Sequence, residues 1–399
     1  MKKIILQMLT ISFVLFTSTS ANAVNLTVGN ILVERLGNGT TALSNAATDI
    51  AVLEFTTSGS AIQTISFPST GATQQTDSGS ASSNGYLNSY NGFVAVTGNN
   101  SSAGTASVAG LNTKVTSVLD NTGAVVNRTT YPTGGPTGTP VSPFSGNNLR
   151  SAIATGSNTF YASGAASGTP NTGGVWYSDG ASFTQISSTA TGQPTNLRNV
   201  EIFNNQLYVS SSSSGFLGIS KIGTGLSTTS GQTVSLEINM GTGASPYGFV
   251  MFDTNRDSLL DTAFIADDRA SAGGGLQKWT FNGTAWVNSY SLRFDAAAGN
   301  LSATASSGFV GIRGLTGGYD DTTGAFSLFA TTTETASNRI VSVLDNGATP
   351  TTYTTLASAG ANNVFRGIDI VTVPEPSSAT LLGLGFLALL GVRRLNRKA

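Results

Sequence analysis

Short stretches in which apolar and polar residues alternate recur from about residue 29 to residue 371. Gly, Asn, Asp and Ser separate them. Alternation with a period of two is typical of half-buried β-strands, and these separating residues favour turns. No long segment with a helical period lies between residues 24 and 373. The pattern therefore predicts an all-β domain of many short strands, such as NILVERL, DIAVLEF, QLYVSSS and LQKWTF.

The predicted strands repeat at a regular interval. Asn-Leu-Arg occurs at 148–150 and at 196–198, and the related Ile-Arg-Gly and Phe-Arg-Gly occur at 312–314 and 365–367. Their spacing corresponds to a period near 50 residues, with a copy lacking arginine expected at 245–252. A repeat of this length, with four short strands in each copy, is typical of β-propeller blades.

A second repeated motif supports the same period, because Ser-Val-Leu-Asp-Asn occurs at 117–121 and at 342–346. We expect a sixth blade to combine the strands of 29–67 with the strand of 364–371, since joining the two chain ends closes the ring. Seven blades, a pair of β-sandwiches and a parallel β-helix are the alternatives. The other five predicted blades span about 85–131, 147–187, 196–238, 245–292 and 308–355.

The N-terminal segment 1–23 has the composition of a secretory signal peptide. Two lysines precede an apolar stretch, and the segment ends in Ala21-Asn22-Ala23, an A-x-A cleavage pattern. We expect signal peptidase to cleave here, so that the exported body begins near Val24. The alternative is a transmembrane anchor, although the apolar stretch is short for a bilayer core of about 30 Å.

The C-terminal segment 374–399 has three parts in a fixed order. Pro374-Glu375-Pro376 comes first, an apolar stretch follows, and a basic cluster that includes Arg393 and Arg394 comes last. The apolar part, 379–392, is shorter than the roughly 20 residues of a typical spanning helix. Its basic end is expected to stay on the cytoplasmic side. This order predicts a single hydrophobic helix that holds the end of the chain in the membrane.

The same segment resembles the PEP-CTERM sorting signal of Gram-negative bacteria. The resemblance covers 374–399 and implies processing by exosortase, with cleavage near Pro-Glu-Pro. It also implies transient anchoring in the inner membrane, release to the cell surface or extracellular matrix, and a link to exopolysaccharide and biofilm. A plain membrane anchor is the alternative. The body, over about 250–290 and 308–345, resembles secreted bacterial propeller proteins, which implies a fold and no activity.

Composition excludes several functions for the body between the two end segments. Only 10% of the chain is charged. Six of the 19 basic residues lie in 1–23 and 377–399, which leaves 13 basic and 20 acidic residues in 24–376 and a net charge of −7. Such a body is a poor partner for nucleic acid, whose phosphates require Lys and Arg. The absence of Cys and His removes disulfides, thiolate catalysis and Ser-His-Asp catalysis.

Four arginines occupy equivalent places in the predicted innermost strands: Arg150, Arg198, Arg313 and Arg366. In a closed ring they could line the central channel and bind anions such as uronate carboxylates through bidentate hydrogen bonds. In the second interpretation each arginine pairs with an Asp or a carbonyl of the neighbouring blade and holds the two blades together.

Aromatic side chains are candidates for stacking on sugar rings, but the alternating pattern places Trp176 and Trp279 inside strands, where they fill the space between blades. The other candidates are Tyr177, Tyr247 and Trp286.

The stretch DTNRDSLLD begins like a calcium-binding loop, with Asp253, Asn255 and Asp257 at the first, third and fifth positions. Ser258 then replaces the expected Gly, and Phe264 replaces the bidentate Glu. A turn capped by Asx side chains is the simpler interpretation. We therefore expect no cofactor, with calcium as the alternative.

Two pairs of adjacent carboxylates, Asp267-Asp268 and Asp320-Asp321, are candidates for a glycosidase dyad. Neighbouring residues of a strand point to opposite faces, which favours turns instead. The sequence thus predicts a non-enzymatic, exported propeller that binds or scaffolds, with polysaccharide as its expected partner. The alternative is a secreted carbohydrate-active enzyme, a lyase or a glycosidase.

Overall fold

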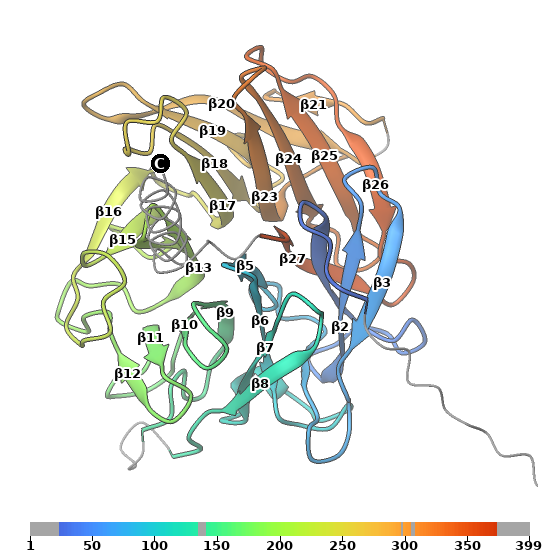
Figure 1. Cartoon of the computed structure of the whole chain (residues 1–399), viewed down its shortest axis with the longest axis vertical. Helices are drawn as coiled ribbons and strands as arrows, with labels where there is room; N and C mark the ends of the chain where they lie inside the picture. Colours follow the sequence, from blue (N-terminus) through green and yellow to red (C-terminus); the bar gives the residue numbers. More distant parts are fainter. Residues whose placement is uncertain (1–23, 135–140, 297, 305–307, 373–399) are drawn as a thin grey trace, which may run out of the picture.

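The structure is a computed structural model that describes residues 24–134, 141–296, 298–304 and 308–372. These residues form 27 β-strands and one short 3-10 turn, η1 (Val108–Gly110). The strands assemble into sheets that surround a common axis, as Figure 1 shows, and every strand pair within a sheet is antiparallel. The described chain is therefore an all-β, propeller-like ring of sheets.

Three separate sheets contain four strands each, and a fourth contains six. In the first three, consecutive strands pair in chain order. The first consists of β9 (Leu149–Ala154), β10 (Phe160–Gly164), β11 (Gly174–Ser178) and β12 (Phe183–Gln185). The second consists of β13 (Leu197–Phe203), β14 (Gln206–Ser211), β15 (Gly218–Ile222) and β16 (Val234–Asn239). The third consists of β23 (Ile312–Asp320), β24 (Ala325–Thr332), β25 (Arg339–Asp345) and β26 (Thr354–Ser358).

The six-stranded sheet extends the same four-strand pattern with two very short strands at its outer end. Its strands are β17 (Pro246–Phe252), β18 (Thr262–Asp267), β19 (Gly275–Phe281), β20 (Trp286–Asp295), β21 (Leu301–Ser302) and β22 (Phe309–Val310). The four sheets coincide with four of the predicted repeats. β12 ends two residues before its predicted limit, and β16, β20 and β26 end one to three residues after theirs.

The fifth sheet has nine strands and joins two such sets. One set is β27-β1-β2-β3 and the other is β5-β6-β7-β8; the three-residue strand β4 pairs with both β2 and β6 and so links them. Its strands are β1 (Ile31–Leu36), β2 (Ala47–Phe55), β3 (Ala61–Ser66), β4 (Thr76–Ser78), β5 (Asn88–Tyr90), β6 (Phe93–Asn99), β7 (Lys114–Leu119), β8 (Val125–Thr130) and β27 (Val364–Ile370).

The first and last strands pair with each other, as the sequence predicted. β1 runs antiparallel to β27, with Ile31 opposite Ile370 and Leu36 opposite Val364. The two Ser-Val-Leu-Asp repeats also occupy equivalent places, because one lies in β7 and the other in β25, each the third strand of its set.

The strands β5, β9, β13, β17, β23 and β27 each stand at one end of a four-strand set and lie nearest the axis (Figure 1). Each contacts the next around the ring, and β27 contacts β5, so the circle is complete. An inner strand is enclosed on both faces, and β9 is accordingly buried along its length, whereas the outer strand β26 is exposed or half-buried throughout. We refer to these six as the inner strands.

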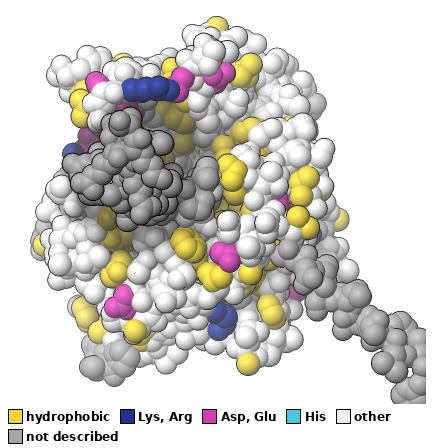
Figure 2. All heavy atoms as spheres, in the orientation of Figure 1, with side chains coloured by type: hydrophobic (Ala, Val, Ile, Leu, Met, Phe, Trp, Pro, Cys, Tyr) yellow, Lys and Arg dark blue, Asp and Glu magenta, His cyan; other side chains and the backbone are white. Residues whose placement is uncertain are grey.

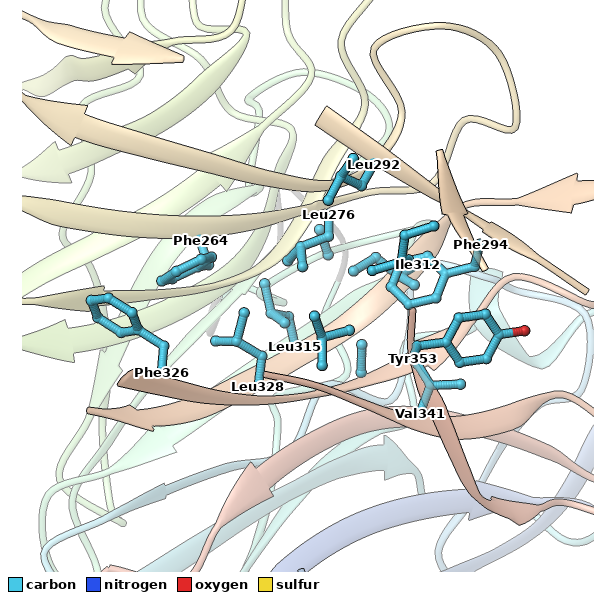
Figure 3. Packing of buried hydrophobic residues seen from close by; sticks show 14 of the residues in the cluster. Phe264, Leu276, Leu292, Phe294, Ile312, Leu315, Phe326, Leu328, Val341 and Tyr353 are labelled. Atoms are coloured by element: carbon cyan, nitrogen blue, oxygen red, sulfur yellow. The ribbon is translucent and has the colours of Figure 1, made fainter. Parts of the chain in front are cut away.

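Apolar clusters fill the wedges between neighbouring sheets. Figure 3 shows the largest, in which side chains of β17–β20 meet those of β23–β25. The rings of Phe264 and Phe326 lie 4.9 Å apart between centroids, and Phe264 is fully buried. Burying one such side chain contributes about 1.5–3 kcal/mol, so these wedges supply most of the force that holds sheet to sheet.

Glycines allow the inner strands to approach one another closely. A Cβ on Gly367 would lie 2.5 Å from the backbone N of Leu87, and one on Gly314 would lie 2.6 Å from the carbonyl O of Arg366. Both distances are shorter than contacts that real side chains make. The glycine that follows arginine in these repeats is therefore required by packing around the axis.

The described residues contain no helix long and apolar enough to cross a membrane. The predicted signal peptide, 1–23, and the predicted C-terminal helix lie outside the described residues. Charged side chains are sparse on the face drawn in Figure 2, in keeping with the low charge content of the chain.

Candidate functional site

The equivalent position near the start of each inner strand defines a ring of large polar side chains around the axis. We call it the inner ring, and its residues are Tyr86, Arg150, Arg198, Tyr247, Arg313 and Arg366. The structure thus brings together all four arginines that the repeat singled out. Tyr247 lies in the repeat at 245–252, which was expected to lack arginine.

Tyr86 is the member of the inner ring that sequence reasoning missed. It lies two residues before β5, its backbone N–H donates to the carbonyl of Arg150, and the preceding Gly85 accepts from Gly367. It stacks on Tyr247 with ring centroids 5.8 Å apart and an interplanar angle of 24°. Its place at the start of the predicted repeat of about 85–131 could have marked it, because that repeat begins with the Gly-Tyr-Leu-Asn of 85–88.

Arg150 and Arg198 each reach the start of the next inner strand. Arg150 donates to the carbonyl of Leu197 at 3.0 Å, and Arg198 donates to the carbonyl of Pro246 at 2.7 Å. The guanidinium of Arg198 also lies over the Tyr247 ring, 3.9 Å from its centroid. These are the contacts of the second sequence interpretation, in which the arginines hold neighbouring blades together.

Arg313 and Arg366 also have partners in neighbouring sets of strands, as the second sequence interpretation expects. Arg313 forms an ion pair with Asp268 at 3.2 Å, and Arg366 donates to the carbonyl of Gly79 at 3.0 Å. That is the only hydrogen bond of the Arg366 side chain to the described residues, and its buried Nε has no acceptor there. A guanidinium carries five donors, so Arg366 retains most of its hydrogen-bonding capacity.

Both of these arginines line a pocket of about 400 Å³ at one end of the ring axis. Its walls come from the β1–β2, β4–β5, β24–β25 and β26–β27 connections. Apart from the two arginines, the lining side chains are uncharged. We call this the arginine pocket; its other residues are Ala42, Leu43, Gly79, Ser80, Ser82, Thr335, Ala336 and Asn362.

Two buried carboxyl groups lie behind Arg366. Glu34 on β1 is fully buried, and neither of its oxygens has a hydrogen-bond partner among the described residues. Burial, and then the nearby Asp77, raise the pKa of Glu34, against the attraction of Arg366. Burial, and then the neighbouring Arg313, lower the pKa of Arg366 to about 10. Arg366 therefore remains cationic at neutral pH.

A second pair of carboxyl groups, which sequence reasoning also missed, lies further along the inner strands. Asp369 accepts from the backbone N–H of Ser89 at 2.6 Å and from the hydroxyl of Thr316 at 2.7 Å, and burial raises its pKa to about 6. Burial, and then the proximity of Asp369, raise the pKa of Glu201. Neither residue falls in a repeated motif, so no sequence signal marked them.

The aromatic candidates fall into two groups. Trp176 and Trp279 are buried, and their indole N–H groups donate to the carbonyl of Thr172 and to the side chain of Gln277, both at 2.9 Å. They are core residues, as the alternation indicated. Trp286 and Tyr177 are partly exposed.

The candidate calcium loop places its acidic side chains against its own backbone. Asp253 accepts from the N–H groups of Asp257 and Ser258, and Asp257 accepts from that of Leu259. These are Asx-capped turns, the simpler of the two interpretations. Within the part of the chain that the structure describes, no group of three or more His, Cys, Asp or Glu side chains is placed to hold a metal ion.

The paired aspartates are engaged with other partners. Asp267 binds Arg269 at 2.7 Å, and Asp268 binds Arg313. Asp320 accepts from the backbone N–H of Thr322 at 2.8 Å, and Asp321 forms an ion pair with Arg256. The adjacent carboxylates therefore have separate partners.

Comparison with known proteins identifies the C-terminal segment. Residues 372–397 match the model of the PEP-CTERM protein-sorting motif. The chain therefore carries this motif, which implies an exported protein processed by exosortase and delivered to the cell envelope or surface. The motif residues Pro374, Glu375, Pro376, Arg393 and Arg394, and the candidate cleavage residues Ala21 and Ala23, lie outside the described residues.

Among solved structures, the crystal structure of AofleA from Arthrobotrys oligospora is similar at 10% identity and a TM-score of 0.30, covering 88% of this chain and 92% of that one. A quinonprotein alcohol dehydrogenase-like protein from Bacteroides thetaiotaomicron is similar at 10% identity and a TM-score of 0.35, covering 90% and 98%. These scores carry no information about function. A search of curated protein sequences finds no significant match.

Proposed function

We propose that this chain is a non-enzymatic, six-bladed propeller, exported by a signal peptide, that binds acidic polysaccharide at the cell surface or in the extracellular matrix. The body would comprise residues 24–373, between the signal peptide and the tail of 374–399. Signal peptidase and exosortase would be its processing partners, and the tail would hold it in the inner membrane only transiently.

The closed circle of inner strands supports the count of six blades. Each inner strand heads a set of four antiparallel strands, and the nine-stranded sheet resolves into two such sets once the short link β4 is set aside. β1 and β27 would then close the ring within one blade, which removes a free sheet edge.

The observation that carries the binding role is the arginine pocket. Arg313 and Arg366 contribute two guanidinium groups to a concave site whose other side chains are uncharged. Planar guanidinium groups match the geometry of carboxylates and form bidentate hydrogen bonds with them. Serine, threonine and asparagine side chains beside them could form hydrogen bonds with sugar hydroxyl groups. A polysaccharide with uronate residues fits this chemistry, and it agrees with the exopolysaccharide link that the sorting motif suggests.

The position of the pocket supports a surface role as well. Arg366 lies near the start of β27, and the described chain ends at Thr372, six residues later. An extended segment of that length covers about 20 Å. The tail would thus leave from the end of the ring opposite the arginine pocket, and a protein held by its tail would present the pocket away from the membrane.

Calorimetric titration of the exported protein with hexagalacturonate, and with the same oligosaccharide fully methyl-esterified, tests the proposal. We expect binding to the free acid and none to the ester. Arg313→Gln removes one guanidinium, and Ser80→Glu places a negative charge on the exposed rim. A hydrogen bond to a charged group contributes about 1.5–3 kcal/mol, so each variant is expected to bind at least about tenfold more weakly.

Arg256→Gln is the matched control, because it removes an exposed arginine outside the pocket. Equal affinity of all variants, or equal affinity for acid and ester, would show that the arginine pocket is not the binding site. The size of the recovered oligosaccharide decides between binding and catalysis. An unchanged hexamer agrees with a binding role, and shorter products would establish the carbohydrate-active enzyme instead.

A further inference from the structure

A second cleft lies between the sheet β13–β16 and the sheet β17–β20. It has a volume of about 460 Å³ and is formed by the β13–β14, β15–β16, β17–β18 and β19–β20 connections with the adjoining strand ends. In an antiparallel four-strand set these connections lie at the end of the ring opposite the arginine pocket. We call it the tryptophan cleft and define it by Tyr208, Lys221, Glu237, Leu259, Phe281 and Trp286.

An aromatic pair lies in this cleft. The rings of Phe281 and Trp286 lie 5.7 Å apart between centroids and are tilted by 50°. Trp286 is partly exposed, and its indole N–H has no acceptor among the described residues, unlike those of Trp176 and Trp279. Leu259 on the rim is 64% exposed. An accessible indole offers an apolar face and a free hydrogen-bond donor. It is therefore suited to a ligand that has both an apolar face and hydrogen-bond acceptors.

The polar wall of the cleft has no net charge. Lys221 on β15 and Glu237 on β16 form an ion pair at 3.1 Å, with side chains that are 42% and 32% exposed. They are the two charged residues among the described residues that line the cleft. An anionic ligand would meet the carboxylate of Glu237, and a purely apolar ligand would desolvate the ion pair without replacing its contacts with water.

We propose that the tryptophan cleft binds a neutral pyranose residue of a polysaccharide. The C–H face of the sugar would stack on Trp286, and its hydroxyl groups would bond to the indole N–H and to the Lys221–Glu237 pair. Concave sites of this volume, apolar with a few convergent polar groups, are typical of small-ligand sites. The proposal deepens the proposed function, on which it rests for the class of ligand, by adding a site for neutral sugar units at the other end of the ring.

The exported protein labelled with 5-fluorotryptophan provides the test, because it has three tryptophans and hence three fluorine resonances. The resonance of Trp286 is assigned by its loss in Trp286→Phe. The probes are neutral hexasaccharides of glucose, of mannose and of galactose, with hexagalacturonate as the acidic counterpart. We expect a saturable shift of the Trp286 resonance with at least one neutral probe, while those of Trp176 and Trp279 stay in place.

In the unlabelled protein, Trp286→Ala is expected to weaken binding of that probe by about 30-fold or more, the loss typical of a central aromatic contact. Val287→Ala is the matched control, since the next residue of the strand points to the other face and is already 47% exposed. No shift with any neutral probe, or a shift with hexagalacturonate alone, would overturn the proposal.

The two sites can fail separately. Arg313→Gln should leave the response of Trp286 to the neutral probe unchanged, and Trp286→Ala should leave the affinity for hexagalacturonate unchanged. In the native protein, no binding of hexagalacturonate together with a normal Trp286 response would refute the arginine pocket and leave the tryptophan cleft intact. Binding of hexagalacturonate with no Trp286 response to any neutral probe would refute only the cleft.

Discussion

Replacing the buried Glu34 by Gln tests the electrostatics behind the arginine pocket. Glu34 is fully buried and has no hydrogen-bond partner among the described residues, and burial raises its pKa well above 4.5. The folded protein therefore binds this proton more tightly than the unfolded chain does. The contribution of Glu34 to stability is fully present below pH 4.5 and is lost as the pH rises towards the folded-state pKa.

The magnitude follows from proton linkage. One proton bound only in the folded state changes the free energy of unfolding by about 1.4 kcal/mol per pH unit. Between pH 5.5 and 7.5 we expect the native protein to lose up to about 2.7 kcal/mol relative to the Glu34→Gln variant. Asp77, Arg366 and Lys114 are unchanged in the Glu34→Gln variant. The difference in the free energy of unfolding between the native protein and this variant therefore isolates the contribution of Glu34.

Urea unfolding at pH 5.5, 6.5 and 7.5, for both proteins, gives this difference directly. Glu54→Gln is the matched control, because Glu54 is also buried but accepts hydrogen bonds from Thr27, Asn30 and Gln63. Losing such bonds should destabilise the fold by about 1–3 kcal/mol at pH 7.5. If the native protein and Glu34→Gln keep a constant stability difference across the three pH values, the argument that burial raises the pKa of Glu34 is wrong.

Three further substitutions test the packing and an exposed ion pair. Phe264→Ala should lower the free energy of unfolding by about 3–5 kcal/mol, since it empties the largest wedge between sheets, and a loss under 1 kcal/mol would contradict that packing. Gly367→Ala should cost about 1–3 kcal/mol, because its Cβ would collide with the backbone at Leu87; an unchanged midpoint in urea would argue against the close approach. Arg256→Gln breaks an exposed ion pair and should change stability by at most about 1 kcal/mol in the same assay.

The repeat made most of the architecture predictable. Alternation located the strands, and the arginine spacing placed both the repeats and the equivalent positions of the inner ring, including Tyr247. This worked because an inner strand must present the same position to the axis in each repeat. β4 was missed, since three residues, Thr76–Ser78, are too few to show a period.

The chemistry was less predictable than the fold. Tyr86 replaces arginine in its repeat, so a search for arginine passed over it. Glu34, Glu201 and Asp369 were identified only by their burial in the structure. The sequence of an alternating strand does not show whether a carboxylate side chain points to solvent or into the ring. The tryptophan cleft joins residues of two sheets, and no local motif in the sequence could have indicated it.

The central claim is that an exported propeller is released by processing at its sorting motif. It is tested most directly by the intact mass of the protein recovered outside the cells, in strains with and without exosortase. The account predicts a body that begins near Val24 and ends near Pro376, found outside only when exosortase is present. A mass that includes every residue to Ala399 in both strains would contradict it, and the tail would then be a plain membrane anchor.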